Sequence, residues 1–534
     1  MGRGQVWRGR LVALAAGAAA ALAHPPFGLL PGLLAYALML WSIERPGPAP
    51  LRQAFGRGWQ AGVGYFAVSC CWIVEPFFVD AKTQGWMAPF AIVLLAGGLA
   101  LFWGAAALIY RASRARGFTR VLVFAGCLAG AEWLRGHVLS GFPWDLPGET
   151  WRAGSAPSQA AAVVGAYGLT WITLALAAAP VLLFDPRSRA ERIVPLGLAA
   201  IALAALYAFG AGRLHAAAMV PETAPRVRIV QADIDQKDKW RPENLEQIFE
   251  TYLSLTRHPD PGGPDLVVWP EGALPAVIDD MLAPGQPYGP ALVAALSPGE
   301  TLLMGANRGE VGPDGKPLYF NSLVALRREG EGLRVTGVYD KHHLVPFGEY
   351  MPLAAFAQKI GFRSLVHMPD DFTAGPPSRP LALAGAPPVQ PLICYEALFP
   401  GLVRQGAIRS ALRPAWILNV SNDAWFGQGS GPLQHLNLAS YRAIEEGLPI
   451  IRSTPTGVSA VIDAYGRIRP GARRGLGELG VIDARLPPAL SPTPYSRFDD
   501  LPFLAMLLVS AVAAVLGRAR RDKAQDPAAA LGGT

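Results

Sequence analysis

Charged side chains are scarce in this sequence. Asp, Glu, Lys and Arg together make up 16% of the 534 residues, against roughly a quarter in ordinary soluble domains. The deficit lies in one part of the chain, because residues 11–214 consist mainly of long apolar runs, whereas residues 225–495 have a mixed composition. An ordinary soluble protein is therefore excluded, and the first part is predicted to lie in a membrane.

Cysteine is also rare, with four residues in the chain. Cys70, Cys71 and Cys127 fall within apolar runs, where a thiol mostly serves as a small apolar filler. Cys394, in the stretch LICYEALFP, is the only cysteine of the 225–495 region and has no evident disulfide partner there. A leftover thiol of this kind is either buried and inert or kept for its reactivity. Its position alone leaves both possibilities open.

The apolar runs are long enough to cross a membrane, since a spanning helix needs about 20 largely apolar residues. They predict an N-terminal membrane domain over 1–214 with seven spans, a last span within 500–518 and a tail over 519–534. The spans are expected near residues 11–23, 31–43, 58–79, 86–110, 119–139, 163–184, 193–213 and 501–517. The first two flank HPPFG as a short hairpin, and a cleaved signal peptide over 1–23 is the alternative.

The distribution of arginine predicts the orientation of these spans, because loops rich in Lys and Arg stay in the cytoplasm. Arginines gather before the first span and after the second, fourth, sixth and eighth, and the other short loops carry few. Both termini are therefore expected in the cytoplasm of a bacterium, with the 225–495 domain on the periplasmic face of its inner membrane. The net charge of +7 reflects these arginines, so no nucleic-acid partner is expected.

Residues 225–495 alternate short β runs with helical stretches, which predicts a layered α/β domain. Continuous apolar strands that end in polar residues indicate a sheet covered on both faces, with functional groups at the strand ends. The region has no internal repeat and no glycine-rich phosphate loop. Strands are expected at 226–234, 265–271, 301–307, 321–328, 333–341, 389–396, 415–423 and 457–466, and helices at 244–257, 289–297 and 433–447.

Three strand ends carry reactive side chains. A carboxylate (Glu271), an amine (Lys341) and a thiol (Cys394) each stand where a predicted strand gives way to a loop. A Glu or a Lys after a strand, taken alone, is typical of a solvated loop. Together they indicate a shared pocket, because strand ends bring side chains from distant sequence positions to one edge of a sheet.

The residues around these strand ends resemble the motifs of the nitrilase superfamily. The matching segments are VVWPEGALP, YDKHHLVPFGEYMP, LICYEALFP and SNDAWFG. With the multi-span N-terminal part and the single C-terminal span, the chain is similar over essentially its whole length to the membrane-bound apolipoprotein N-acyltransferases. The resemblance implies an α-β-β-α sandwich that carries a Glu-Lys-Cys triad.

The resemblance also implies the roles of the site residues. Cys394 is expected to be the nucleophile, Glu271 the base that accepts its proton, and Lys341 a fixed positive charge. Lys341 would favour the thiolate and, with the backbone N–H of Tyr395, stabilise the tetrahedral oxyanion. Supporting or substrate-binding roles are implied for Glu349, Tyr395, Glu396 and Trp240.

The implied reaction is a ping-pong acyl transfer. A phospholipid gives its acyl chain to Cys394 as a thioester, and the acceptor is the α-amino group of the S-diacylglyceryl cysteine of an apolipoprotein. No cofactor and no metal are expected, and the protein is expected to be a monomer. The alternatives are a membrane-anchored amidase that hydrolyses the thioester with water and an inactive binding protein on the same fold.

Other polar residues leave questions that the sequence does not answer. His342 and His343 are adjacent, so their side chains point to opposite faces of an extended segment and a structural role is favoured over a metal site. The segment 342–356 is expected either to gate the site as an apolar loop or to pack as core. Within predicted spans, Glu75, Glu132 and Arg135 are expected to pair or to line a cavity.

Overall fold

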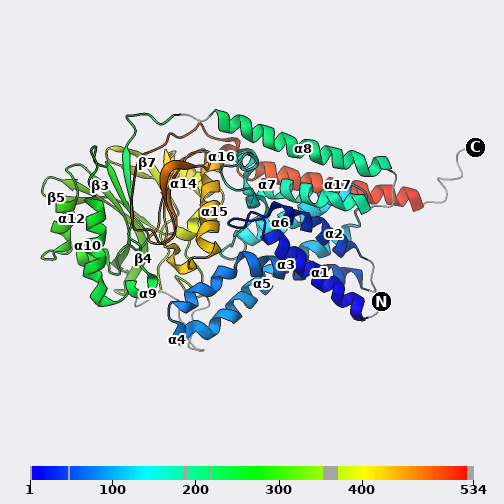
Figure 1. Ribbon diagram of the computed structural model, residues 1–534, viewed down its shortest axis with the longest axis horizontal. Helices are drawn as coiled ribbons and strands as arrows, with labels where there is room; N and C mark the ends of the chain where they lie inside the picture. Colours follow the sequence, from blue (N-terminus) through cyan, green and yellow to red (C-terminus); the bar gives the residue numbers. More distant parts are fainter. Residues whose placement is uncertain (1–2, 46–48, 185–188, 217–218, 353–370, 526–534) are drawn as a thin grey trace, which may run out of the picture. The chain divides into compact units, whose positions relative to one another are not determined.

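The computed structural model describes residues 3–45, 49–184, 189–216, 219–352 and 371–525. The chain forms two compact units (Figure 1). The helical unit consists of Met1–Val74, Met87–Ala216 and Arg497–Thr534, and the α/β unit consists of Glu75–Trp86 and Ala217–Ser496.

Each of the eight stretches predicted as spans overlaps a helix of the helical unit. These helices are α1 (Arg3–Ala21), α2 (Ala35–Glu44), α3 (Pro50–Ser69), α5 (Ala88–Ser113), α6 (Thr119–His137), α7 (Ala161–Ala178), α8 (Arg189–His215) and α17 (Leu501–Gln525). Small residues let these helices pack closely: a Cβ added to Gly62 of α3 would lie 2.8 Å from Ala100 of α5. Close contact between helix backbones at small residues is typical of membrane helices.

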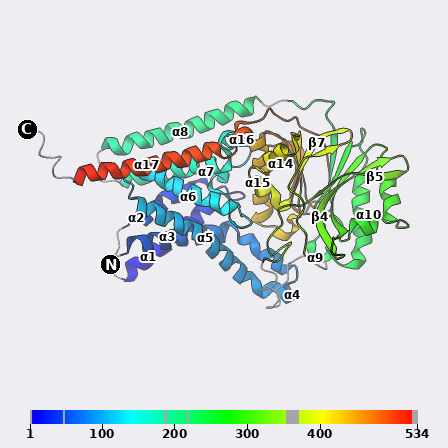
Figure 2. The same cartoon turned by 180° about the vertical axis from the view of Figure 1, so that it is seen from behind.

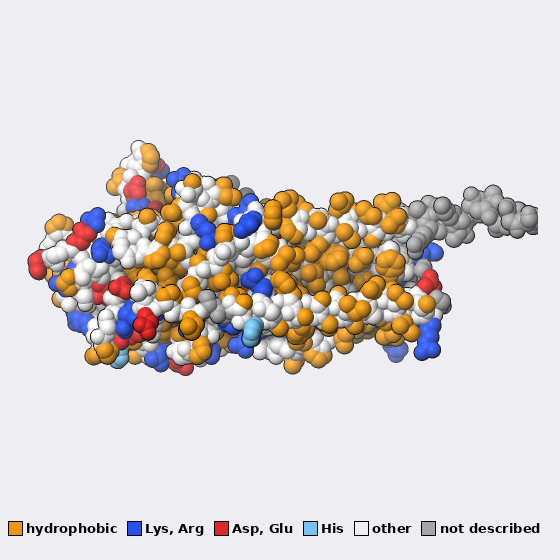
Figure 3. Space-filling view, turned by 90° about the horizontal axis from the view of Figure 1, so that it is seen from above, with side chains coloured by type: hydrophobic (Ala, Val, Ile, Leu, Met, Phe, Trp, Pro, Cys, Tyr) orange, Lys and Arg blue, Asp and Glu red, His pale blue; other side chains and the backbone are white. Residues whose placement is uncertain are grey.

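Large apolar side chains cover the outside of the helical unit, as Figure 3 shows for one of its faces. Leu94 of α5 is 73% exposed, Ile201 of α8 67% and Leu508 of α17 64%. Apolar surfaces of this extent are stable in contact with lipid and costly in water. Three helical stretches among the described residues are long and apolar enough to cross a membrane, or up to four if the bent pair Pro50–Ser69 and Cys71–Phe78 is one span. The larger number of eight spans stays a prediction.

Two charged residues of α6 pair with each other inside the helical unit. Arg135 Nε donates to Glu132 Oε2 at 3.1 Å, and Trp103 Nε1 donates to Glu132 Oε1 at 2.5 Å. Both charged side chains are buried. The expectation that these residues pair is thus confirmed, and the pairing reduces the cost of a charge in an apolar environment.

The α/β unit contains two six-stranded sheets, with the strand orders β12-β1-β2-β3-β4-β5 and β11-β10-β9-β8-β7-β6. The strands of the first sheet are β1 (Arg226–Gln231), β2 (Leu266–Trp269), β3 (Thr301–Val311), β4 (Pro317–Glu329), β5 (Gly332–Asp340) and β12 (Gly480–Arg485). Those of the second are β6 (Leu381–Leu383), β7 (Ala386–Ile393), β8 (Trp416–Val420), β9 (Ile450–Ser453), β10 (Ser459–Ile462) and β11 (Ile468–Arg474).

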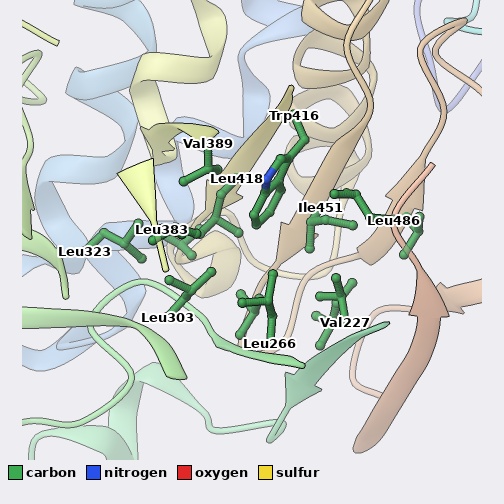
Figure 4. Packing of buried hydrophobic residues seen from close by; sticks show 14 of the residues in the cluster. Val227, Leu266, Leu303, Leu323, Leu383, Val389, Trp416, Leu418, Ile451 and Leu486 are labelled. Atoms are coloured by element: carbon green, nitrogen blue, oxygen red, sulfur yellow. The ribbon is translucent and has the colours of Figure 1, made fainter. Parts of the chain in front are cut away.

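The two sheets face each other across an apolar core, which Figure 4 shows in close view. Because side chains alternate along a strand, Leu266 and Val268 of β2 point into this core, whereas Val267 and Trp269 pack on the other face of the sheet. Helices cover the outer faces (Figures 1 and 2). They are α10 (Leu245–Thr256) and α12 (Tyr288–Ala295) on the first sheet, and α14 (Leu402–Ser410) and α15 (Ser430–Glu446) on the second. The predicted α-β-β-α sandwich is confirmed.

Candidate functional site

The first sheet delivers Glu271 and Lys341 to the same edge. Strand β2 is parallel to β3, and two successive antiparallel pairings, β3–β4 and β4–β5, make β5 parallel to both. Glu271 follows the end of β2 by two residues and Lys341 directly follows β5. Parallel strands end at one edge, so the two side chains meet there although 70 positions separate them in the sequence.

Lys341 lies between two carboxylates. Its Nζ is 2.9 Å from Glu349 Oε1 and 3.3 Å from Glu271 Oε1, and its side chain is 1% exposed. Asn321 of β4 donates through Nδ2 to the same two carboxylate oxygens, at 2.7 Å each. Burial alone would lower the pKa of Lys341, but Glu349 and Glu271 outweigh it and raise that pKa above its usual range. Lys341 is therefore a permanent positive charge.

Cys394 begins the turn that leaves β7 in the second sheet. The expected strand over 389–396 is too long, since β7 ends at Ile393 and the short helix η8 (Cys394–Leu398) follows. The cause is the backbone of Cys394, which is left-handed with φ +49°. For a residue with a Cβ this conformation costs roughly 1–2 kcal/mol, and such strain gathers at functional sites.

The thiol of Cys394 is buried and feels the charges of the other two residues. Burial raises its pKa, the Glu271 carboxylate adds to that rise, and Lys341 opposes it. Lys341 thus favours the thiolate, as expected, without overcoming burial. The resting group is therefore a neutral thiol.

Glu396 ties together the two segments that carry Lys341 and Cys394. Its Oε1 accepts hydrogen bonds from Tyr339 Oη at 2.7 Å and from the backbone N–H of His342 at 2.9 Å. Its Oε2 accepts from the N–H of Ile393, next to Cys394, at 2.9 Å. Burial raises the pKa of this carboxyl, whereas the bond from Ile393 opposes that rise. Sequence reasoning left the role of Glu396 open, and these contacts show that it bonds both the Lys341 segment and the Cys394 segment.

Replacing Glu396 by Gln should therefore destabilise the α/β unit and misplace the nucleophile. The amide nitrogen of glutamine cannot accept hydrogen bonds, so at least one buried N–H loses its acceptor, which costs about 1–3 kcal/mol. We expect a lower melting temperature in detergent and a fall in kcat. Glu331→Gln, at an exposed turn, is the matched control. Unchanged melting and kcat in Glu396→Gln would contradict this role.

The SNDAWFG segment completes the surroundings of Glu271. The backbone N–H of Asn422 donates to Glu271 Oε2 at 2.6 Å, so both oxygens of this carboxylate are held. Deeper in the fold, Asp423 accepts from Arg452 Nη2 at 2.6 Å and lies 2.8 Å from His435 Nδ1. The other ring nitrogen, His435 Nε2, donates to the carbonyl oxygen of Cys394 at 3.3 Å. The buried network thus contacts the left-handed backbone of Cys394.

Two other predicted site residues flank this centre. Trp240 is half-buried at the end of the short helix α9 (Gln236–Lys239). This helix is joined to the SNDAWFG segment, because Asn422 Nδ2 donates to Gln236 Oε1 at 3.0 Å. Tyr395 is buried and its ring meets the Phe399 ring edge-on at 5.1 Å. Asn321, Asn422, Asp423, His435 and Arg452 were missed as individual site residues.

The segment after Lys341 is packed at some positions and exposed at others, and its gating role stays a prediction. His342 Nδ1 lies 2.8 Å from the carbonyl oxygen of Gly375, and the His343 ring stacks on Phe399 at 4.8 Å. Among the described residues, no group of three or more His, Cys, Asp or Glu side chains could hold a metal ion. Leu344 is buried, whereas Phe347 is 60% exposed, and Phe356 lies outside the described residues.

Glu75 belongs to the α/β unit rather than to a helix of the helical unit. Its carboxyl group lies against Gly427 of the SNDAWFG segment, where a Cβ would be 2.7 Å from the carboxyl carbon. Gly427 has φ +65°, so glycine is required there both by its backbone and by this close approach. Glu75 was expected to pair or to line a cavity, and the structure shows its close contact with Gly427.

Comparison with known proteins agrees with this architecture. The family model described as "Apolipoprotein N-acyltransferase N-terminal domain" matches residues 16–179, and the one described as "Carbon-nitrogen hydrolase" matches residues 226–494. A protein of Caulobacter vibrioides named apolipoprotein N-acyltransferase is 56% identical, over 96% of this chain and 95% of its own length. One of the same name from Brucella melitensis is 38% identical, over 96% of this chain and 97% of its own length.

Solved structures resemble part of the chain. An amidase of the nitrilase superfamily from Nesterenkonia is 19% identical, covers 51% of this chain and 94% of its own, and gives a TM-score of 0.35. A carbon-nitrogen hydrolase from Helicobacter pylori is 17% identical, covers 49% of this chain and 88% of its own, and also gives 0.35.

Proposed function

The chain belongs to the apolipoprotein N-acyltransferase family, and from this premise we propose that it acylates apolipoproteins through a thioester on Cys394. As a family member it is a membrane-bound acyltransferase of lipoprotein maturation. In the proposed reaction the acyl chain comes from a phospholipid and the acceptor is the α-amino group of the N-terminal S-diacylglyceryl cysteine. The observation that supports this most is the buried Lys341, held between Glu271 and Glu349 beside the Cys394 thiol.

In the first half-reaction, Glu271 removes the proton of Cys394 while the sulfur attacks the ester carbonyl carbon. A base is needed because burial keeps this thiol neutral. The charge that develops on the carbonyl oxygen is stabilised by Lys341 and by the backbone N–H of Tyr395. When the tetrahedral intermediate collapses, the ester C–O bond breaks and Glu271 returns the proton to the leaving alkoxide. A thioester and a lysophospholipid result.

In the second half-reaction, the neutral α-amino group attacks the thioester carbonyl. The nitrogen loses a proton to Glu271, the C–S bond breaks, and the sulfur leaves as a thiolate that Glu271 reprotonates. Glu349 does not touch the reacting atoms in this scheme. It holds Lys341 through Oε1 and accepts from the N–H of Val345 through Oε2 at 2.8 Å, so its proposed role is to position Lys341.

The membrane arrangement is proposed to serve two lipid-anchored substrates. The α/β unit is placed on the periplasmic face of a bacterial inner membrane, with both termini in the cytoplasm and the protein acting as a monomer. The exposed apolar helices and the arginine-rich alternate loops support this placement. A soluble amidase would need no such helices. An enzyme with two membrane-bound substrates needs them, because they hold its α/β unit at the membrane where both substrates lie.

The molecule that accepts the acyl chain distinguishes the proposed transferase from an amidase: a peptide amine in the first case and water in the second. Purified protein is incubated with phospholipid carrying a labelled acyl chain and with an S-diacylglyceryl peptide whose N-terminus is either free or acetylated. Transfer of label to the free peptide alone is expected, with little free fatty acid released when no acceptor is present. Rapid release of fatty acid, independent of the peptide, would identify a hydrolase and overturn the proposal.

A further inference from the structure

A second lysine is buried beside Glu271, outside the triad. Lys239 ends helix α9, and only 3% of its surface is exposed. Its Nζ lies 3.6 Å from the position that a Cβ on Gly272 would occupy, directly after Glu271 in the sequence. Burial lowers its pKa to about 8, and the Glu271 carboxylate opposes that fall. The amine is therefore mostly protonated at neutral pH.

Lys239 has no bonded acceptor in the described part of the chain, where its Nζ makes no hydrogen bond and no ion pair. Lys341 differs in this respect, because two carboxylates contact it. Asn307 of β3 flanks Gly272 as well, with Oδ1 4.0 Å from the same Cβ position, and its buried Nδ2 has no hydrogen-bond partner among the described residues. Beside Glu271 the buried Asn307 Nδ2 thus lacks an acceptor, which is costly for a buried donor, and the nearby Lys239 ammonium has no acceptor among the described residues.

The positive charge of Lys239 points to the sign of the group that could bind it. A cationic ligand would be repelled by Lys239, whereas an anionic oxygen would supply the acceptor that its three N–H groups lack. The α-amino group of the acceptor is a cation before it reacts, which makes it a poor partner for this site.

The acyl donor carries such an anionic group close to the base. In the proposed reaction Glu271 returns a proton to the alkoxide of the leaving lysophospholipid, so the glycerol of the donor lies next to Glu271. Its phosphodiester is only a few bonds further along. An ammonium on the same side of Glu271 is thus placed to meet the phosphate, as lysines do at phosphate sites.

We propose that Lys239 Nζ binds the phosphodiester of the phospholipid donor during acylation of Cys394. This inference rests on the proposed function and adds the group that recognises the donor. Lys239 is then a binding residue of the first half-reaction, and the second half-reaction, whose acceptor lipid carries no phosphate, does not use it.

The test compares two acyl donors in the acylation step. Acylation is measured from the intact mass of the protein. The donors are phosphatidylglycerol in detergent micelles and p-nitrophenyl palmitate, an uncharged ester. Lys239→Met should raise KM for phosphatidylglycerol about 10- to 100-fold, as for the loss of a charged hydrogen bond, with a loss at least tenfold smaller for the uncharged ester. Lys239→Arg should recover most of the affinity. Lys237→Met, an exposed lysine of the same helix, is the matched control.

Two outcomes would overturn the inference. An equal loss with both donors would mean that Lys239 acts on the triad or on folding, and a loss confined to transfer from the preformed thioester would make it a proton acceptor for the amine. If Lys239→Met does not fold, Lys239→Gln is measured in the same way. Acylation of the unchanged protein by phosphatidylglycerol tests the proposed function separately, because it does not depend on how Lys239 contributes.

Discussion

Replacing Cys394 by alanine is expected to abolish acyl transfer while the protein still folds and inserts into the membrane. The side chain is the proposed nucleophile, and removing a nucleophile costs several orders of magnitude in kcat, on the order of 10⁴-fold or more. Cys394→Ser should be nearly as inactive, because burial and the weak acidity of a hydroxyl leave no nucleophile of comparable strength. Transfer to a diacylglyceryl peptide measures the loss.

Cys71→Ala is the matched control, since Cys71 is an exposed thiol outside the site and should keep full activity. A melting temperature for Cys394→Ala close to that of the unchanged protein shows that the loss is chemical. An alanine variant that still transfers acyl chains at a tenth of the normal rate would exclude a thioester on Cys394.

Replacing Lys341 by methionine is expected to remove both activity and stability. The substitution leaves the Glu271 and Glu349 carboxylates, which share Asn321 Nδ2 as a donor, without the positive charge between them. Removing one partner of a buried ion pair costs about 3–5 kcal/mol in the free energy of unfolding. The Lys341 ammonium is also proposed to stabilise the oxyanion, so its loss should lower kcat by about 10²- to 10³-fold. Thermal melting in detergent and the transfer assay measure the two effects.

The double variant Lys341→Met, Glu349→Gln separates the two roles. Neutralising Glu349 relieves the repulsion between the carboxylates, so the melting temperature should recover by several degrees while kcat stays low. Coupling of this size is expected only for residues in direct contact. Independent, additive effects of the two substitutions would show that Glu349 does not act through Lys341.

The strands of the core were predictable where their sequences are apolar and continuous. Strands β2 and β8, with LVVW and WILNV, follow the expected pattern, whereas β6, β9, β11 and β12 were missed. The missed strands are short or carry arginine, proline and glycine, and tertiary pairing rather than local propensity fixes them. Arg452 of β9 is buried because Asp423 and Asn419 accept its hydrogen bonds, which no local pattern indicates.

The part of the site that lies at strand ends was predictable from the sequence. Glu271, Lys341 and Cys394 stand at strand ends and match the motifs of a known superfamily, so sequence and topology agree on them. Asn321, within β4, and Lys239, in a four-residue helix, carry no such signal. Their positions depend on how distant segments pack, which becomes visible only in three dimensions.

The thioester on Cys394 is tested most directly by the mass of the intact protein. Purified protein is incubated with phospholipid and without acceptor, and its mass is measured before and after addition of a diacylglyceryl peptide. A single acyl-sized adduct is predicted, located on Cys394, absent from Cys394→Ala, stable in water over the assay and removed by the peptide amine. Transfer of the acyl chain to the peptide with no adduct at any time, or an adduct on another residue, would contradict the proposed mechanism.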